Sequence, residues 1–321
     1  MTEHHTNVLI LGSGPAGCTA GLYAARAMLA PIMVEGEQAG GQLSTTSDVE
    51  NYPGFAAPIT GPWLMEQMKA QAVAFGMRAM SDNIVSVDLS RRPFCLTGRN
   101  ATYFCDALVI CTGAQTRWTN VAGETAFRNF GVSSCATCDG FFYRQQEVAV
   151  IGGGNTAVEE ALALSSIAAR VTLIHRRDTL RAEAILQERL RRAPNVEIRW
   201  NTVVEEIVGS EKPRNVQGLR VRDSVTGVAD LIPVDGVFVA IGHKPATELF
   251  AGQLRLTPSG YIEIVGRGTQ TSVPGVFAAG DVTDEHYRQA VTAAGMGCMA
   301  AIDVERWLSG MSDEAAVRVP A

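Results

Sequence analysis

Short apolar runs that end at a glycine recur along the chain and form its clearest pattern. Four such runs lie at residues 7–11, 107–111, 147–151 and 276–279. They consist mainly of Val, Ile, Leu and Ala, which is typical of parallel strands buried on both faces of a sheet. Helical patterns follow two of the runs, at residues 16–29 and 156–168. Alternating strands and helices predict right-handed βαβ units, and therefore an α/β fold with a doubly wound sheet.

The chain contains this strand–turn–helix unit twice. The sequence VLILGSGPAGCTA at residues 8–20 matches VAVIGGGNTAVEE at residues 148–160. The small residues of the two turns are Gly12, Gly14 and Gly17 in the first, and Gly152, Gly154 and Ala157 in the second. In such a turn the first glycine allows a tight bend, the second lets the backbone approach a pyrophosphate, and the third lets the helix pack against the strand. The repeat therefore predicts two Rossmann-like dinucleotide-binding domains.

The residues that end the second strand of each unit differ in charge. Glu35 and His175 both lie 23 positions after the first glycine of their turn (12 to 35 and 152 to 175). Glu35 can accept hydrogen bonds from both ribose hydroxyls and would repel a 2′-phosphate, which suits FAD or NAD. His175 begins a basic segment with Arg176, Arg177 and Arg181, which suits the 2′-phosphate of NADP(H). The alternative for this segment is a solvated basic surface that binds no ligand.

A third candidate nucleotide contact, Asp281, lies near the C-terminus. It follows the strand predicted at residues 276–279 and precedes a helix that we expect to begin around Arg288. A carboxylate at a strand end can accept hydrogen bonds from a polyol such as the ribityl chain of a flavin. The alternative is that Asp281 caps the following helix.

The segment CATCDG at residues 135–140 contains the candidate redox centre. Cys135 and Cys138 have the spacing of a small redox-active disulfide. A structural zinc site would need two further ligands, and the sequence offers none at a suitable spacing. Asp139 directly follows the pair and can give or take the proton that dithiol chemistry moves. A flavin site, an NADPH site and a dithiol together predict a relay of electron pairs from NADPH to a disulfide.

Composition narrows the class of protein. The chain has 321 residues, which suggests two domains, and its 46% hydrophobic and 19% charged residues exclude a disordered chain. Lys and Arg number 27 against 33 Asp and Glu, a net charge of −6, which argues against a nucleic-acid or anionic-membrane binder. The seven cysteines are scattered, and the N-terminus lacks the features of a signal peptide. We therefore expect a cytoplasmic protein.

These motifs resemble one known family, the bacterial low-molecular-weight thioredoxin reductases of the pyridine nucleotide-disulfide oxidoreductase class (class II). The resemblance extends from residue 8 to about residue 308. The matching motifs are GSGPAG at 12–17, GGQL at 40–43, CATCDGFFYR at 135–144, GGGNTAVEEAL at 152–162, HRRD and LRAE within 175–183, and GDV followed by YRQAV within 280–291. The position of the cysteine pair, directly before the second glycine turn, is the most specific of these signals.

The resemblance implies a fold and a function. It implies an FAD-binding domain formed by residues 1–117 and 244–321, and an inserted NADPH-binding domain at 118–243 that carries the cysteine pair. It implies a homodimeric NADPH-dependent thioredoxin-disulfide reductase, with thioredoxin as protein substrate. From ligand spacing and net charge we expect no metal, nucleic acid or membrane partner. The resemblance also implies that the two domains rotate between half-reactions, about hinges near residues 113–116 and 242–245.

The resemblance also assigns roles to individual residues. Cys135 and Cys138 form the redox-active disulfide, and Asp139 is the acid that protonates the reduced system. The implied FAD contacts are Gly12, Ser13, Gly14, Pro15, Gly17, Glu35, Gly41, Gln42, Asn51, Thr112, Gly113, Asp281, Arg288, Gln289 and Ala290. The implied NADPH contacts are Gly154, Asn155, Thr156, His175, Arg176, Arg177 and Arg181.

Three other functions share some of these features. The flavoprotein reductase of a peroxiredoxin system has both nucleotide sites and the cysteine pair, but it usually carries an additional N-terminal domain. We do not expect that domain, because the first predicted strand begins at Asn7. Related reductases of flavodoxin or ferredoxin lack the cysteine pair. A redox-sensing binding protein would bind FAD and NADPH but would reduce no disulfide.

Overall fold

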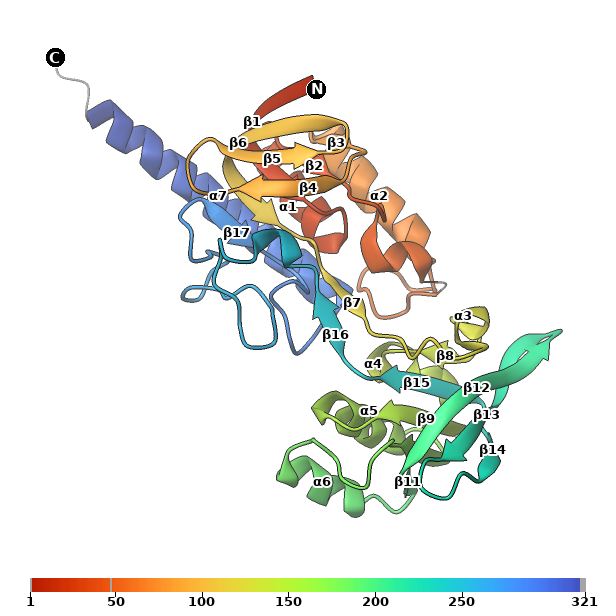
Figure 1. The fold of residues 1–321 in the computed structure, drawn as a ribbon. Helices are drawn as coiled ribbons and strands as arrows, with labels where there is room; N and C mark the ends of the chain where they lie inside the picture. Colours follow the sequence, from red (N-terminus) through yellow and green to blue (C-terminus); the bar gives the residue numbers. More distant parts are fainter. Residues whose placement is uncertain (1, 47, 318–321) are drawn as a thin grey trace. The chain divides into compact units, whose positions relative to one another are not determined.

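The computed structural model describes residues 2–46 and 48–317, and it describes side chains in the last helix only up to residue 311. The chain divides into two compact units (Figure 1). One unit comprises the residues up to 115 together with those from 244 onward, and the other comprises residues 116–243. The second unit is thus inserted into the sequence of the first.

The first unit is built on a seven-stranded sheet with the order β3-β2-β1-β6-β5-β4, in which β17 also pairs with β6. Its strands are β1 (Thr2–Leu11), β2 (Ile32–Val34), β3 (Arg78–Met80), β4 (Ile84–Asp88), β5 (Phe94–Gly98), β6 (Ala101–Ile110) and β17 (Val276–Ala278). Strands β3, β2, β1, β6 and β17 run parallel, whereas β4 and β5 are antiparallel additions. Its helices are α1 (Pro15–Arg26), α2 (Gly61–Ala74) and α7 (Ala290–Val317), with short 3-10 turns η1 (Gly41–Thr45) and η3 (Glu248–Phe250).

Strand β1 is buried on both faces at residues 8–11, where the apolar run predicted it, whereas its earlier residues, which extend the strand back to Thr2, are exposed or half-buried. Leu9 and Leu11 belong to one core cluster, which also contains Phe94 and Leu96 of β5. Because side chains alternate along a strand, Val8 and Ile10 pack into a second cluster on the opposite face, with residues of α1. The core therefore continues through the sheet and fixes the end of β1 beneath the first glycine turn.

The second unit contains a five-stranded, fully parallel sheet with the order β11-β10-β9-β15-β8, and an antiparallel sheet with the order β12-β13-β14. The strands are β8 (Val132–Ser133), β9 (Glu147–Gly152), β10 (Arg170–Ile174), β11 (Val196–Arg199), β12 (Thr202–Glu211), β13 (Arg214–Asp223), β14 (Ala229–Pro233) and β15 (Gly236–Ala240). The helical segments are α3 (Glu124–Phe127), α4 (Ala136–Asp139), η2 (Gly140–Tyr143), α5 (Asn155–Ser165) and α6 (Ala184–Arg191).

Strand β9 shows how the second unit covers its parallel sheet. Val148 and Val150 pack with residues of α5 in one cluster. Ala149 and Ile151 face the other way and pack with residues of β12 and β13, including Ile207 and Leu219. The sequence predicted the parallel sheet and its helices, but the three-stranded antiparallel cover was not predicted.

The chain passes between the two units in β7 (Ala114–Thr116) and β16 (His243–Pro245), which pair with each other. The structure has both predicted strand–turn–helix units, β1-α1-β2 and β9-α5-β10, with parallel registers such as Leu9 opposite Ile32. The predicted α/β fold with two doubly wound units is therefore confirmed. In the described part of the chain, none of the helices combines the length and hydropathy that a membrane span requires.

Candidate functional site

The turn between β1 and α1 leaves room for a ligand only at its central glycine. Gly12 has a φ of +109°, and a Cβ there would overlap the carbonyl oxygen of Cys111. A Cβ at Gly17 would overlap the carbonyl oxygen of Gly12, so the helix can approach only with a glycine at this position. A Cβ at Gly14 would meet no atom within 4 Å, and Gly14 precedes α1 without a side-chain cap. The free backbone N–H groups at this end of α1 fit a pyrophosphate.

Glu35 directly follows β2, as predicted, and its side chain is buried. Lys69 of α2 forms an ion pair with one of its carboxylate oxygens. Ser13 ties this strand end to the glycine turn, because its hydroxyl donates to the carbonyl oxygen of Glu35 at 3.1 Å and accepts from the N–H of Gly40 at 3.0 Å. The Glu35 carboxylate can accept further hydrogen bonds, and ribose hydroxyls are suitable donors. Sequence reasoning missed Lys69, which lies in a helix without a motif.

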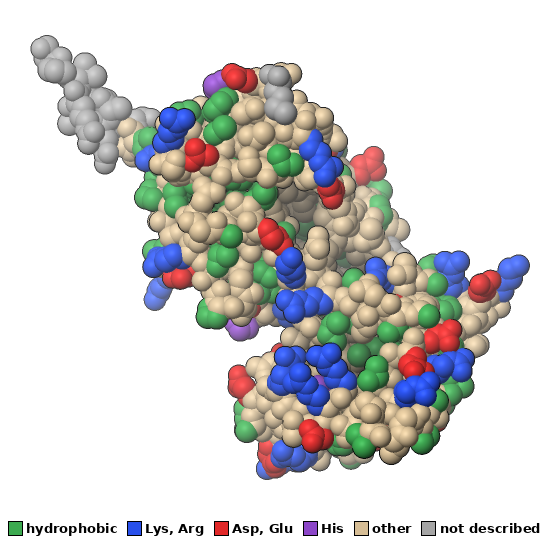
Figure 2. Space-filling view, in the orientation of Figure 1, with side chains coloured by type: hydrophobic (Ala, Val, Ile, Leu, Met, Phe, Trp, Pro, Cys, Tyr) green, Lys and Arg blue, Asp and Glu red, His purple; other side chains and the backbone are tan. Residues whose placement is uncertain are grey.

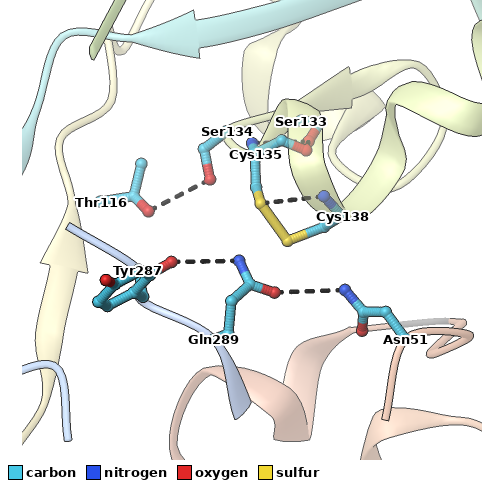
Figure 3. The surroundings of a disulfide bond; sticks show 8 residues. All are labelled: Asn51, Thr116, Ser133, Ser134, Cys135, Cys138, Tyr287 and Gln289. Atoms are coloured by element: carbon cyan, nitrogen blue, oxygen red, sulfur yellow. Dashed lines mark hydrogen bonds between the residues drawn. A yellow bond between two sulfur atoms is a disulfide. The ribbon is translucent and has the colours of Figure 1, made fainter. Parts of the chain in front are cut away.

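Several further predicted flavin contacts lie together in the first unit. Gly41 lies against Gly14, since a Cβ on Gly41 would be 3.4 Å from the Cα of Gly14. The side chain of Gln42 donates to the carbonyl oxygen of Ala114. The hydroxyl of Thr112 donates to the carbonyl oxygen of Ala246 at 2.8 Å. Asn51 Nδ2 donates to Gln289 Oε1 at 3.3 Å (Figure 3). The structure thus gathers residues from distant parts of the sequence around one region of this unit.

Asp281 lies three residues beyond β17. Burial, and secondarily the charge of Asp284, raises its pKa to about 6, while Arg288 opposes the shift. Within the described residues, no side chain or backbone group donates a hydrogen bond to its carboxylate. A buried carboxylate of this kind fits a ligand that brings hydroxyl donors, such as the ribityl chain of a flavin.

Asp284 is a residue that sequence reasoning missed. Its carboxylate accepts hydrogen bonds of 2.9 Å from the backbone N–H groups of His286, Tyr287 and Arg288. These bonds hold the loop that leads into α7, which begins at Ala290 and not at Arg288. Aspartate is a common turn residue because its side chain accepts hydrogen bonds from the backbone N–H groups that follow it, so a turn at Asp284 could have been predicted.

The turn between β9 and α5 in the second unit resembles the first turn. A Cβ at Gly152 would overlap the carbonyl oxygen of Ala240, whereas Gly154 is open. Asn155 begins α5 and is held by Glu183, whose N–H donates to Asn155 Oδ1 at 2.9 Å. Helix α5 has no acidic residue in its first turn, so its positive end is free for a phosphate.

The predicted basic segment follows β10. Arg176, Arg177 and Arg181 are all exposed. Among the described residues, no carboxylate forms an ion pair with any of the three. The N–H of Arg181 donates to the carbonyl oxygen of Gly153 at 2.7 Å, which places this loop beside the glycine turn. Figure 2 shows Lys and Arg side chains gathered on one part of this unit. Unpaired guanidinium groups beside a pyrophosphate turn fit the 2′-phosphate of NADP(H).

His175 differs from the arginines that follow it. The residue is 6% exposed, and both ring nitrogens contact backbone carbonyl oxygens of the same unit. The ring therefore lies inside the protein, which argues against the direct NADPH contact implied by the resemblance.

Cys135 and Cys138 form a disulfide, with Cα atoms 5.3 Å apart (Figure 3). The pair spans the single turn α4, and Cys135 Sγ accepts a hydrogen bond of 3.1 Å from the N–H of Cys138. The hydroxyl of Ser133 accepts from the N–H of Cys135 at 3.1 Å, and Ser134 contacts Thr116 at 3.3 Å. The other five cysteines are free. No cluster of metal-binding side chains occurs among the side chains that the structure describes.

Asp139 lies beside the disulfide in an environment suited to an acid. Burial raises the pKa of its carboxyl group, and a hydrogen bond from Ser133 opposes this shift. The nearby carboxylates of Asp139 and Asp235 add to burial in raising the pKa of Tyr143 to about 12. An aspartic acid with a raised pKa can hold a proton next to the sulfur atoms at a higher pH than an ordinary carboxyl group.

Two aromatic side chains next to the disulfide are exposed. Phe141 is 66% and Phe142 46% exposed, although both are large and apolar. Phe142, Phe130 and Val216 line part of a cavity of about 360 Å³ in the second unit. Sequence reasoning missed this feature, although an apolar Phe-Phe pair directly after a redox motif is a visible signal.

Comparisons with known proteins agree with this site. The model of the family described as pyridine nucleotide-disulphide oxidoreductase matches residues 6–297. A thioredoxin reductase of Rickettsia felis is 55% identical over 305 residues, covering 95% of this chain and 98% of the relative. A thioredoxin reductase of Escherichia coli O157:H7 is 54% identical, covering 97% and 99%. The solved thioredoxin reductase of Giardia duodenalis superposes with a TM-score of 0.91 at 40% identity, covering 95% of this chain and 99% of that one.

These relatives confirm the resemblance on which the sequence interpretation rested. The match extends through both glycine turns and the cysteine pair, and it is not limited to one nucleotide-binding unit. The chain belongs to the pyridine nucleotide-disulphide oxidoreductase family.

Proposed function

We propose that the protein is a thioredoxin-disulfide reductase that passes electrons from NADPH through FAD and the Cys135–Cys138 disulfide to oxidised thioredoxin. The observation that carries this proposal is the disulfide itself, which lies on a partly exposed single turn that ends in the half-buried acid Asp139. A disulfide that served only for stability would not need a carboxyl group with a raised pKa next to it.

Membership of the family implies a flavin and a pyridine nucleotide, and the finer assignment of each to one unit is part of the proposal. FAD in the first unit is supported by the glycine turn, by Glu35 and by the unsatisfied carboxylate of Asp281. NADPH in the second unit is supported by the open turn at Gly154 and by the exposed arginines of the basic segment, for which the structure gives no carboxylate partner among the described residues. When bound, the flavin supplies the electron pair that it takes from the reduced nicotinamide.

The two cysteines and Asp139 carry out the chemistry at sulfur. Reduction of the disulfide breaks the bond between the two sulfur atoms and consumes two electrons and two protons. Asp139 holds one proton beside the sulfurs and can deliver it to the thiolate that forms. One sulfur of the reduced pair then attacks the disulfide of thioredoxin, and a mixed disulfide forms. The second sulfur attacks this bond, which releases reduced thioredoxin and restores the Cys135–Cys138 disulfide.

The exposed phenylalanines support a protein substrate. Phe141 and Phe142 follow the disulfide closely in the sequence and offer exposed apolar area. Large exposed aromatic side chains around a small cavity are typical of protein contact surfaces. The homodimer and the domain rotation implied by the resemblance, and the cytoplasmic location expected from the sequence, stay predictions.

The test is NADPH oxidation by the FAD-loaded enzyme with purified bacterial thioredoxin as acceptor. We expect NADPH consumption that depends on oxidised thioredoxin and yields one dithiol per NADPH. If the protein binds both cofactors but reduces no disulfide, it is a redox-sensing binding protein. If it reduces a peroxiredoxin-system protein but not thioredoxin, the alternative reductase function is correct.

A further inference from the structure

The imidazole ring of His175 is held between two backbone carbonyl groups. Its Nδ1 lies 2.8 Å from the carbonyl oxygen of Gly152, and its Nε2 lies 2.9 Å from that of Thr179. A Cβ at Gly153 would overlap the ring, and Trp200 packs against it edge to face with centroids 6.2 Å apart. The ring is therefore fixed in position by contacts on several sides.

The two contacts are both made with the protein backbone. A carbonyl oxygen can accept a hydrogen bond but cannot donate one, so a ring nitrogen that carries a hydrogen donates to the oxygen that it faces. The ring is therefore held by backbone groups, and no other side chain is needed to place it.

The two carbonyl groups belong to the two halves of the proposed NADPH site. Gly152 lies in the glycine turn, which is suited to the pyrophosphate. Thr179 lies in the loop that carries Arg176, Arg177 and Arg181, which is suited to the 2′-phosphate. One further bond, from the N–H of Arg181 to the oxygen of Gly153, joins the same two segments.

We propose that His175 is a positioning residue that fixes the loop of Arg176, Arg177 and Arg181 (the arginine loop) relative to the glycine turn, so that one NADPH molecule can engage both. This inference rests on the proposed NADPH site. His175 does not touch the coenzyme. It acts through the loop, and the preference for NADPH over NADH depends on it because the arginines act only when the loop is correctly placed.

A double-mutant cycle tests this coupling. The dissociation constant of NADP⁺ is measured by calorimetry on the FAD-loaded, oxidised protein for wild type, His175→Gln, Arg177→Ala and the double variant. We expect His175→Gln to weaken binding several-fold and up to about tenfold, the effect of one lost hydrogen bond. We also expect Arg177→Ala to cost several-fold less in the His175→Gln background than in wild type. Additive losses would overturn the proposal, because they would show that the two residues act independently.

Trp200→Phe is the matched control, since it keeps an aromatic ring against His175 and leaves both hydrogen bonds in place. We expect it to change the affinity for NADP⁺ less than twofold. An equal loss for Trp200→Phe and His175→Gln would mean that packing, and not the two hydrogen bonds, positions the loop.

A measurement on the wild-type protein does not depend on whether a variant folds. The chain has five histidines, so ¹⁵N spectra of histidine-labelled protein can be assigned by single substitutions. We expect the ring nitrogen signals of His175 to shift when NADP⁺ is added, and signals that do not respond to bound NADP⁺ would overturn the link between the ring and the coenzyme site. Wild-type protein that does not bind NADP⁺ would instead contradict the proposed coenzyme, whatever the spectrum shows.

Discussion

Cys135 and Cys138 are joined across a single helical turn, and the backbone N–H of Cys138 donates to the sulfur of Cys135. The Cα separation of 5.3 Å lies within the usual range for a disulfide, so the bond can form and break without rearrangement of the backbone. Asp139 ends this turn, and two exposed phenylalanines follow after Gly140. The redox pair is thus followed along the chain by an acid and then by exposed apolar side chains.

Replacement of one sulfur tests the relay directly. We expect Cys138→Ser to abolish thioredoxin reduction, because no intramolecular disulfide can form, while NADPH still bleaches the flavin absorbance. Cys95→Ser is the control, since Cys95 is a free cysteine in β5 and should not matter. Disulfide turnover that persists in Cys138→Ser would show that another thiol carries the chemistry.

The acid next to the disulfide gives a prediction about rate and pH. We expect Asp139→Asn to lower thioredoxin turnover by a factor on the order of 10²–10⁴, the usual contribution of a general acid. Because burial raises the pKa of Asp139, its protonated form persists to a higher pH than that of an ordinary carboxyl group. Turnover in wild type should fall as the pH rises through this raised pKa.

Stopped-flow measurement of dithiol formation between pH 5 and pH 9 checks both points. The fall with pH should be lost in Asp139→Asn and kept in Asp106→Asn, which alters an exposed carboxylate of the first unit. An unchanged pH profile in Asp139→Asn would exclude it as the proton donor.

The arginine loop gives a prediction about coenzyme choice. We expect Arg177→Ala to weaken NADPH binding by roughly 10- to 150-fold, the effect of losing a charge-assisted hydrogen bond of about 1.5–3 kcal/mol. NADH binding should change little, because NADH has no 2′-phosphate. Fluorescence titration with both coenzymes measures this, and equal losses would show that the arginine does not contact the 2′-phosphate.

The two glycine turns, the strand ends at Glu35 and His175, and the disulfide pair were predictable because each depends on local sequence. Turn geometry, strand burial and a two-residue gap between cysteines are properties of a few consecutive residues. Lys69 and the cavity beside Phe142 were not predictable, because they depend on which distant segments the fold brings together. The orientation of the His175 ring was also not predictable from the sequence, because it depends on contacts with backbone carbonyl groups, which every residue has.

The exposed phenylalanines give a prediction about the protein substrate. We expect Phe142→Ala to raise the KM for thioredoxin about tenfold, because truncation of an aromatic contact residue typically costs about 1–3 kcal/mol. Reduction of a small aromatic disulfide by the same variant should be unaffected. Phe75→Ala is the matched control, since Phe75 is similarly exposed, at 48%, and lies at the end of α2 in the other unit. Equal effects on both substrates would contradict a docking role.

Asp281 gives a prediction about stability. Its pKa is raised from 3.8 to about 6 by burial, so the folded protein binds more protons than the unfolded chain between these values. The free energy of unfolding of flavin-free protein should therefore fall as the pH rises from 4 to 7. Asp281→Asn should be more stable than wild type at pH 7 by about 2 kcal/mol and nearly equal at pH 4, given about 1.4 kcal/mol per pKa unit and some remaining solvent contact.

Urea unfolding at the two pH values measures this difference. A stability gain that is the same at pH 4 and pH 7 would show that the substitution acts through packing and not through the charge of Asp281.

An anaerobic titration of the purified, flavin-loaded protein with NADPH, followed by visible absorbance, tests the central claim most directly. A protein that contains one flavin and one redox-active disulfide should take up four electrons, so that full reduction needs two equivalents of NADPH per flavin. A protein that stays colourless after incubation with excess FAD, or a titration that ends at one equivalent, would contradict a relay from NADPH through flavin to the Cys135–Cys138 pair.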